Sequence, residues 1–151
     1  MPHKITLAEA YEQIVDSLIR RFNDETKPGG ELDEIKQVVD GDKLDYAPDH
    51  PALWVWADDA HVIGETSMVE TWELPVILAV VYYDNNPVNG RKQAQKLVAK
   101  SRSVARKNRR LGLPFVQDVR SAYFIPNTDH ETKSNLYGAG AAVNVIFNVI
   151  E

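Results

Sequence analysis

The segment that decides the fold runs from residue 76 to residue 114 and reads VILAVVYYDNNPVNGRKQAQKLVAKSRSVARKNRRLGLP. Its first part, Val76 to Tyr83, is apolar on both faces, which is typical of a central strand covered on two sides. Asp84-Asn85-Asn86-Pro87 then predicts a turn into a helix over Arg91 to Arg110. A long strand followed by a helix therefore forms the centre of the predicted domain.

The predicted helix is strongly basic. It holds nine of the 17 Lys and Arg residues of the chain and no Asp or Glu. At about 100° per residue the basic side chains occupy one half of the helical wheel and apolar or small side chains the other, so the helix lies on a core with a cationic outer face. Gly112 and Pro114 follow in the order that terminates a helix. The basic residues are Arg91, Lys92, Lys96, Lys100, Arg102, Arg106, Lys107, Arg109 and Arg110.

This helix divides the charge of the molecule unequally. Subtracting its nine positive charges from the formal net charge of −5 leaves −14 on all other residues. Like charges one turn apart repel by a few tenths of a kcal/mol per pair, which favours a partner. Contact with an acidic protein surface, including that of a second copy, is the favoured interpretation. A solvated outer face and a nucleic-acid contact stay open as alternatives.

Length and composition limit the number of domains and the class of protein. With 151 residues the chain fits one domain, and its hydrophobic share of 44% and charged share of 26% are those of an ordinary soluble protein. The absence of Cys excludes disulfides and a cysteine nucleophile. No apolar run approaches the roughly 20 residues that cross a bilayer, so no membrane contact is expected and we expect a cytoplasmic product.

The remaining elements complete an α+β prediction. The chain is expected to form a mainly antiparallel sheet of about four to five strands packed by two main helices, with open sheet edges. Thr6 and Glu9 form a capping box ahead of the first helix. A polar segment over about 126–137 predicts a long mobile loop. The predicted elements are a helix over Thr6–Asn23, an uncertain strand or helix end over Ile35–Val39, and strands over Ala52–Ala57, Ser67–Tyr83 (containing Pro75), Phe115–Ile125 and Ala139–Val149.

Two tryptophans are further interface candidates. Trp54 and Trp56 lie on the same face of the predicted Ala52–Ala57 strand, opposite Leu53 and Val55. Strand aromatics are most often core residues, yet two on one face also fit a subunit contact, where Trp is enriched.

Catalytic signals are weak. Asp58, Asp59 and His61, with Glu65 nearby, carry metal-binding groups, but their spacing matches no ligand pattern and a loop is the better interpretation. Asp129-His130-Glu131 also carries metal-binding groups, and a solvated loop is again the better interpretation. No phosphate-binding glycine loop or nucleophile elbow is present. The sequence therefore predicts a protein that is not an enzyme and has no cofactor and no metal.

In the order of its elements the chain resembles the tail-terminator (tail-completion) proteins of long-tailed bacteriophages. The likeness covers most of the chain. It rests on an opening helix ending in Arg20-Arg21-Phe22, the strand Pro51 to Val55, the long strand Glu73 to Val80, the basic helix closing at Leu111-Gly112-Leu113-Pro114, and the final strand Ala141 to Phe147.

The resemblance implies a non-enzymatic virion protein. It implies a homo-oligomeric ring of about six copies that caps the tail tube, joins it to a neck or connector protein and, in contractile tails, touches the last sheath layer. DNA would pass through the lumen without specific binding. The resemblance places the protein in the tail or neck of the virion, after assembly in the host cytoplasm. Another neck or connector ring is the structural alternative, and a small nucleic-acid-binding module is the alternative of another class.

Overall fold

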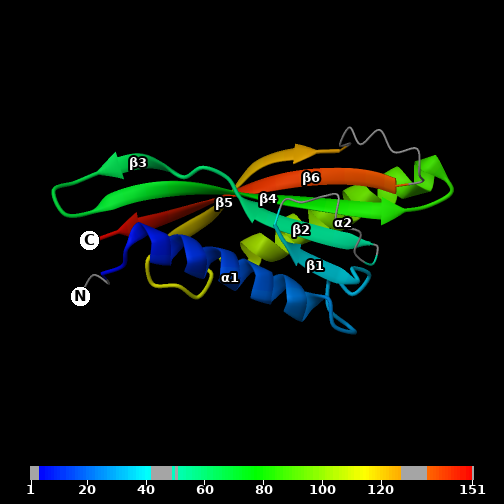
Figure 1. The fold of residues 1–151 in the computed structure, drawn as a ribbon, viewed down its shortest axis with the longest axis horizontal. Coiled ribbons are helices and arrows are strands. Elements are labelled where there is room, and N and C mark those ends of the chain that lie inside the picture. The colour runs from blue at the N-terminus through cyan, green and yellow to red at the C-terminus, as the bar shows by residue number, and fades with distance from the viewer. Residues whose placement is uncertain (1–3, 42–48, 50, 127–135, 151) are drawn as a thin grey trace.

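The structure, a computed structural model, describes residues 4–41, 49, 51–126 and 136–150. Two long helices and six strands make up this part of the chain (Figure 1). In chain order the elements are α1 (Leu7–Glu25), β1 (Gln37–Asp40), β2 (Ala52–Ala57), β3 (His61–Glu65), β4 (Glu70–Tyr83), α2 (Pro87–Lys107), β5 (Val116–Ile125) and β6 (Leu136–Val149).

All six strands of the described residues belong to one sheet. The strand order is β1-β2-β4-β6-β5, and β3 pairs with the first part of β4. Every neighbouring pair is antiparallel except β1 and β2, which run parallel. In Figure 1, β3 and the start of β4 extend as a hairpin arm at one end of the molecule. The sheet therefore ends in β3 and β1 on one side and in β5 on the other.

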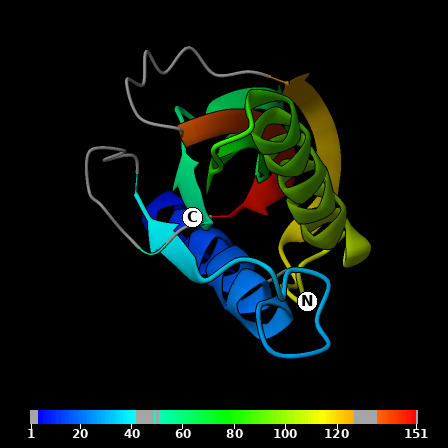
Figure 2. The same cartoon turned by 90° about the vertical axis from the view of Figure 1, so that its right-hand side faces the viewer.

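Both helices cover the same face of the sheet. Figure 2 shows the sheet curled around them, with α1 and α2 on its hollow side. Helix α1 begins where predicted, because the Glu9 N–H donates to the Oγ1 of the N-cap Thr6 at 3.2 Å. Its buried residues recur at helical spacing and pack with alternate residues of β6. Each large apolar side chain buried there contributes about 1.5–3 kcal/mol.

Pro75 lies inside the long strand β4. It occupies the junction at which the partner of β4 changes from β3 to β2. At this junction the Asp58 N–H donates to the Pro75 carbonyl at 2.8 Å. The N and O atoms of one strand residue point to the same side, so the backbone N of Pro75 faces the gap between β3 and β2. The lack of an N–H on Pro75 therefore costs no hydrogen bond between strands.

The α+β class with a mainly antiparallel sheet is confirmed, and the number of strands differs from the prediction. The uncertain element near residue 35 is strand β1, so the sheet includes one parallel pair. Residues expected to form a loop after β2 form strand β3, and the sheet has six strands in place of four to five. Strand β3 is short and mostly exposed, so its sequence carries no clear pattern of buried and exposed residues. Its pairing with β4, and not burial, holds it in place.

The basic helix also differs at both ends. Helix α2 begins at Pro87, where the Asn86 side chain accepts from Val88 N and Asn89 N at 3.0 and 3.2 Å. It ends at Lys107, because Asn108 is extended and Gly112 follows with a left-handed φ of +67°. Arg109 and Arg110 therefore lie beyond the helix. The loop predicted over 126–137 falls largely outside the described residues, although β6 already begins at Leu136.

Candidate interaction surface

Three lysines of α2 face acidic side chains from the segment between α1 and β1. Lys96 Nζ lies 3.5 Å and Lys100 Nζ 3.8 Å from the same Oε1 of Glu34. Lys107 pairs with Glu31. The helix has no acidic residue of its own, so the fold supplies its counter-charges from a segment about sixty to seventy-five positions earlier in the chain. This pairing reduces the repulsion that the sequence alone suggested.

Arginines at the C-terminal half of α2 and just beyond it lie along the outer edge of β5. Two of them donate to backbone carbonyls, and one donates to a serine hydroxyl. The donor–acceptor pairs are Arg102 Nη2 to Ser121 Oγ (2.6 Å), Arg106 Nε to Val119 O (3.3 Å) and Arg110 Nε to Val116 O (3.2 Å). The first half of the β5 edge is therefore covered by guanidinium groups.

Asp118 of β5 forms a bidentate ion pair with Arg109. Arg109 Nη2 donates to Asp118 Oδ2 at 2.9 Å, and Arg109 Nε donates to the other carboxylate oxygen. The hydrogen bond from Arg109, aided by the backbone N–H of Val119, lowers the pKa of Asp118 from 3.8 to about 2. This bidentate pair ties the turn after α2 to β5.

Asp118→Asn is expected to lower the free energy of unfolding at pH 7 by about 1 kcal/mol, less than the full pKa shift implies, because solvent screens the pair. The folded pKa of Asp118 lies below the unfolded value, so the stabilisation is present above about pH 4 and is lost as pH falls toward 2. Urea unfolding at several pH values measures this.

Glu34→Gln is the matched control, since its lysine pairs are longer and exposed. We expect its effect to stay below about 0.5 kcal/mol. A difference in the free energy of unfolding between the wild type and Asp118→Asn that stays unchanged from pH 7 to pH 2 would contradict the stabilising role given to the Asp118–Arg109 pair.

Of the nine basic residues predicted as an interface, seven have partners within the chain. For Arg91 and Lys92, at the start of α2, the described residues provide no ion pair and no side-chain hydrogen bond. Both side chains are exposed. The cationic surface that is free for a partner is therefore smaller than the sequence indicated, and it lies toward the N-terminal end of α2.

The two tryptophans differ in accessibility. Trp54 is only 1% exposed and packs with Ala52, Ala79 and Val81 on the sheet face away from the helices. Its Nε1 has no hydrogen-bond partner in the described part of the chain. Trp56 lies on the same face but is only partly buried. Trp54 is thus a core residue of the folded chain, which corrects its placement on a contact surface, and only Trp56 remains accessible.

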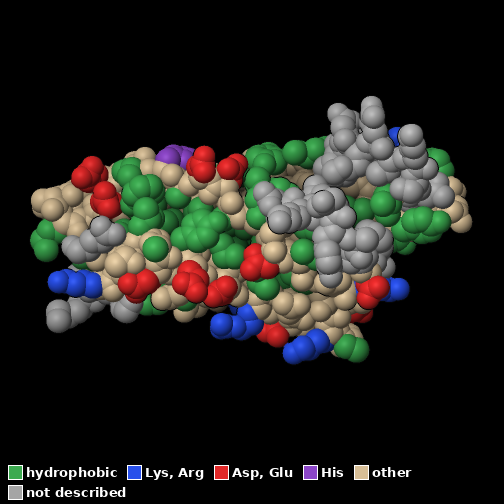
Figure 3. Space-filling model, in the orientation of Figure 1, with side chains coloured by type: hydrophobic (Ala, Val, Ile, Leu, Met, Phe, Trp, Pro, Cys, Tyr) green, Lys and Arg blue, Asp and Glu red, His purple; other side chains and the backbone are tan. Residues whose placement is uncertain are grey.

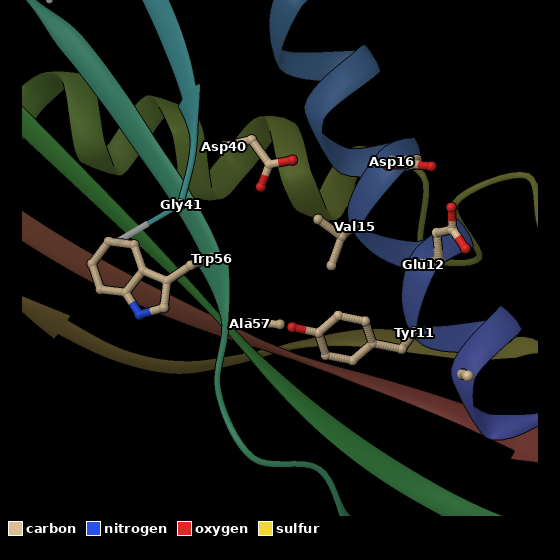
Figure 4. A pocket seen from close by; sticks show the side chains of 9 residues that line it. Tyr11, Glu12, Val15, Asp16, Asp40, Gly41, Trp56 and Ala57 are labelled. Atoms are coloured by element: carbon tan, nitrogen blue, oxygen red, sulfur yellow. The ribbon is translucent and has the colours of Figure 1, made fainter. Parts of the chain in front are cut away.

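A cleft of about 670 Å³ opens between α1 and the ends of β1 and β2. Figure 4 shows Glu12 and Asp16 on its helix side and Asp40 on its strand side, with Tyr11 and Trp56 among the lining side chains. The carboxylates are spread over two walls. The cleft is an acidic surface and does not contain a nucleophile with a paired base.

The residues weighed as metal ligands do not form a site. Asp58 accepts the Asp59 N–H at 2.8 Å, and His61 Nε2 lies 3.4 Å from Glu73 across the β3–β4 pair. Glu65 stands at the far end of β3. Nowhere in the described ranges do three His, Asp or Glu side chains come together as a metal centre would require. Asp129-His130-Glu131 lies outside the described residues.

Two features of this surface were missed at the sequence level. The first is the set of acidic partners, Glu31, Glu34 and Asp118, which no local pattern links to α2. The second is an exposed apolar end on β5, where Tyr123, Phe124 and Ile125 are 47%, 45% and 41% exposed. Three consecutive apolar residues at a strand end were a signal for it, since a half-buried strand alternates.

Neither helix of the described residues is long and apolar enough to cross a membrane. No protein-family model matches the chain, and no curated protein matches it in sequence.

Proposed function

We propose that this chain is a structural protein of a bacteriophage tail, which assembles as a ring of about six copies, caps the tail tube and joins it to the neck. The observation that carries the proposal is the division of the molecule into two charged parts. Residues 44–90 contain no Lys or Arg, whereas residues 91–110 contain nine. A subunit that is acidic on one part and basic on another favours head-to-tail contacts, and such contacts close into a ring when the rotation permits.

The partners follow from this role. One face of the ring binds the tail tube protein and the other a neck or connector protein; in a contractile tail the rim also meets the sheath. DNA passes through the lumen without specific binding. The ring needs no cofactor and performs no catalysis. Arg91, Lys92 and Trp56 are the members of the contact surface that stay accessible, and the protein resides in the tail or neck of the virion.

A head–tail connector or another neck ring would use the same contacts and is the nearest alternative. A small nucleic-acid-binding module is the alternative of another class, and the exposed Arg91 and Lys92 favour it. It is less well supported, because the other basic residues of α2 and the following turn already bind Glu31, Glu34, Asp118 and β5.

Native mass spectrometry over a range of concentrations tests the proposal. We expect a species of about six subunits, populated less as salt rises because opposite surface charges are screened over about 10 Å at 0.1 M. Electron microscopy of tail tubes mixed with the protein should show a ring at one tube end.

A stable dimer that never grows further would contradict the ring. A monomer that binds duplex DNA with a steep loss of affinity on adding salt would instead support the nucleic-acid-binding module.

A further inference from the structure

The edge of β5 is open along only part of its length. The guanidinium groups of Arg110 and Arg106 donate hydrogen bonds to the backbone carbonyls of Val116 and Val119, respectively. At the other end Gln95 Nε2 donates to the Pro126 carbonyl at 3.1 Å. Between these points, over residues 121–125, the described side chains make no hydrogen bond to the outer backbone of β5. An edge with free N–H and C=O groups is a template for another strand.

Exposed aromatic and aliphatic side chains mark the same open stretch. Tyr123, Phe124 and Ile125 lie there, and Phe124 also lines a hollow of about 290 Å³ with Ala99 of α2. Natural edge strands are usually blunted by charged residues or proline. The side chains of residues 121–125 include neither, so this edge is suited to pairing.

The opposite edge of the sheet carries a second open strand of similar length. Strand β3, His61–Glu65, pairs with β4 on one side, and no described strand lies on its other side. Val62 and Ile63 are 41% and 46% exposed. Among the described residues the molecule thus has two uncovered, partly apolar edge segments of five residues each, on opposite sides of its sheet.

The two edges differ in charge. Residues 58–73, which include the hairpin arm of β3 and β4, contain five carboxylates and no Lys or Arg. Figure 3 shows red and green but no blue over β3. Arg102, Arg106 and Arg120 surround the open part of β5. Pairing β3 with β5 therefore brings opposite charges together, whereas pairing two copies of β3 brings like charges together.

We propose that β3 of one copy adds to the open part of β5 of the next copy, so that one sheet continues from subunit to subunit. This inference rests on the ring assembly proposed above and identifies the contact that builds it. Three antiparallel steps separate β3 from β5 within one chain, so the two strands run in opposite directions. A sheet that continues into the next copy makes the new pair antiparallel, the arrangement with the more stable ladder.

The register of the strands sets the offset between copies. Strand β3 lies level with residues 146–149 of β6, and the open part of β5 lies level with residues 140–143. Neighbouring copies are thus displaced by about 20 Å along the strands, at about 3.3 Å per residue. A closed ring absorbs such a displacement when its strands tilt from the ring axis, as strands do in closed barrels.

Site-specific cross-linking tests this contact, and the chain suits it because it has no Cys. Ile63→Cys and Phe124→Cys are made separately, mixed at equal concentration and treated with a short bis-maleimide, which tolerates a small error in register. We expect a covalent dimer in the mixture. The chain carrying both substitutions should form a ladder of covalent oligomers, because β4 and β6 separate the two thiols by about 14 Å or more within one copy.

The matched control mixes Ile63→Cys with Asp24→Cys, an exposed position on α1, and should yield no more dimer than either variant alone. Phe124→Lys should leave the monomer folded and raise the dissociation constant of the oligomer at least about tenfold. If native mass spectrometry shows a ring but the mixed variants do not cross-link, the strand pairing is wrong and the ring stands. A protein that stays monomeric and does not cross-link overturns both.

Discussion

Phe147→Ala is expected to lower the free energy of unfolding by about 3–5 kcal/mol and the melting temperature by roughly 10 °C or more. Phe147 is fully buried on the helix-covered face of β6. Its ring meets that of Phe115 edge to face, with centroids 6.5 Å apart and planes at 79°. Truncation removes this aromatic contact and leaves a cavity that β4 and β5, paired on either side, cannot close.

Phe124→Ala is the matched control for this prediction. It removes the same ring from the neighbouring strand β5, but Phe124 is 45% exposed. We expect a loss below about 1 kcal/mol, because little apolar area is returned to water. Urea unfolding of the two variants makes the comparison. Equal decreases in the free energy of unfolding for the two variants would show that Phe147 is not a core residue.

Gly90→Ala is expected to destabilise the protein by about 1–2 kcal/mol, against the normal trend for a helix interior. Ala usually stabilises a helix by about 1 kcal/mol relative to Gly. At Gly90, however, a Cβ would lie 2.2 Å from Cδ2 of the Tyr137 ring on β6. Overpacking of this kind costs about 1–3 kcal/mol, so the clash outweighs the propensity. The missing side chain is what lets α2 approach β6 at this point.

A double-mutant cycle separates the two effects. In a Tyr137→Ala background the clash is absent, and Gly90→Ala should become neutral or stabilising by up to about 1 kcal/mol. The coupling between the two positions is then about 2 kcal/mol, measured by urea unfolding of the four proteins. Additive effects would mean that the Gly90–Tyr137 contact does not limit the approach of α2.

Several elements were predictable because their signals are local. The capping box at Thr6 and Glu9 marks the start of α1 within a residue. The apolar run at Val76 to Tyr83 identified β4, which lies between β2 and β6 in the sheet. Alternation over the last strand placed one face of β6 in the core, where Val143, Val145 and Phe147 are buried. In each case a pattern that spans only a few neighbouring residues indicates the element.

Other features depend on contacts between distant segments. The counter-charges of α2 come from Glu31 and Glu34, which precede their lysine partners by more than sixty positions, and from no residue of the helix itself. Trp54 and Trp56 share a face and look alike in sequence, but one is a core residue and the other is accessible. Ion pairing and burial are set by what packs against a side chain, which its own neighbours in sequence do not reveal.

By itself, the sequence determined the α+β class, the long central strand and the unequal distribution of charge, because composition and short-range periodicity encode these properties. The tertiary structure alone decided which charges are neutralised internally, that His61–Glu65 becomes a strand, and where the two edges of the sheet stay open. Edges are a property of strand order, and strand order follows from long-range pairing whose free energy is summed over the whole sheet.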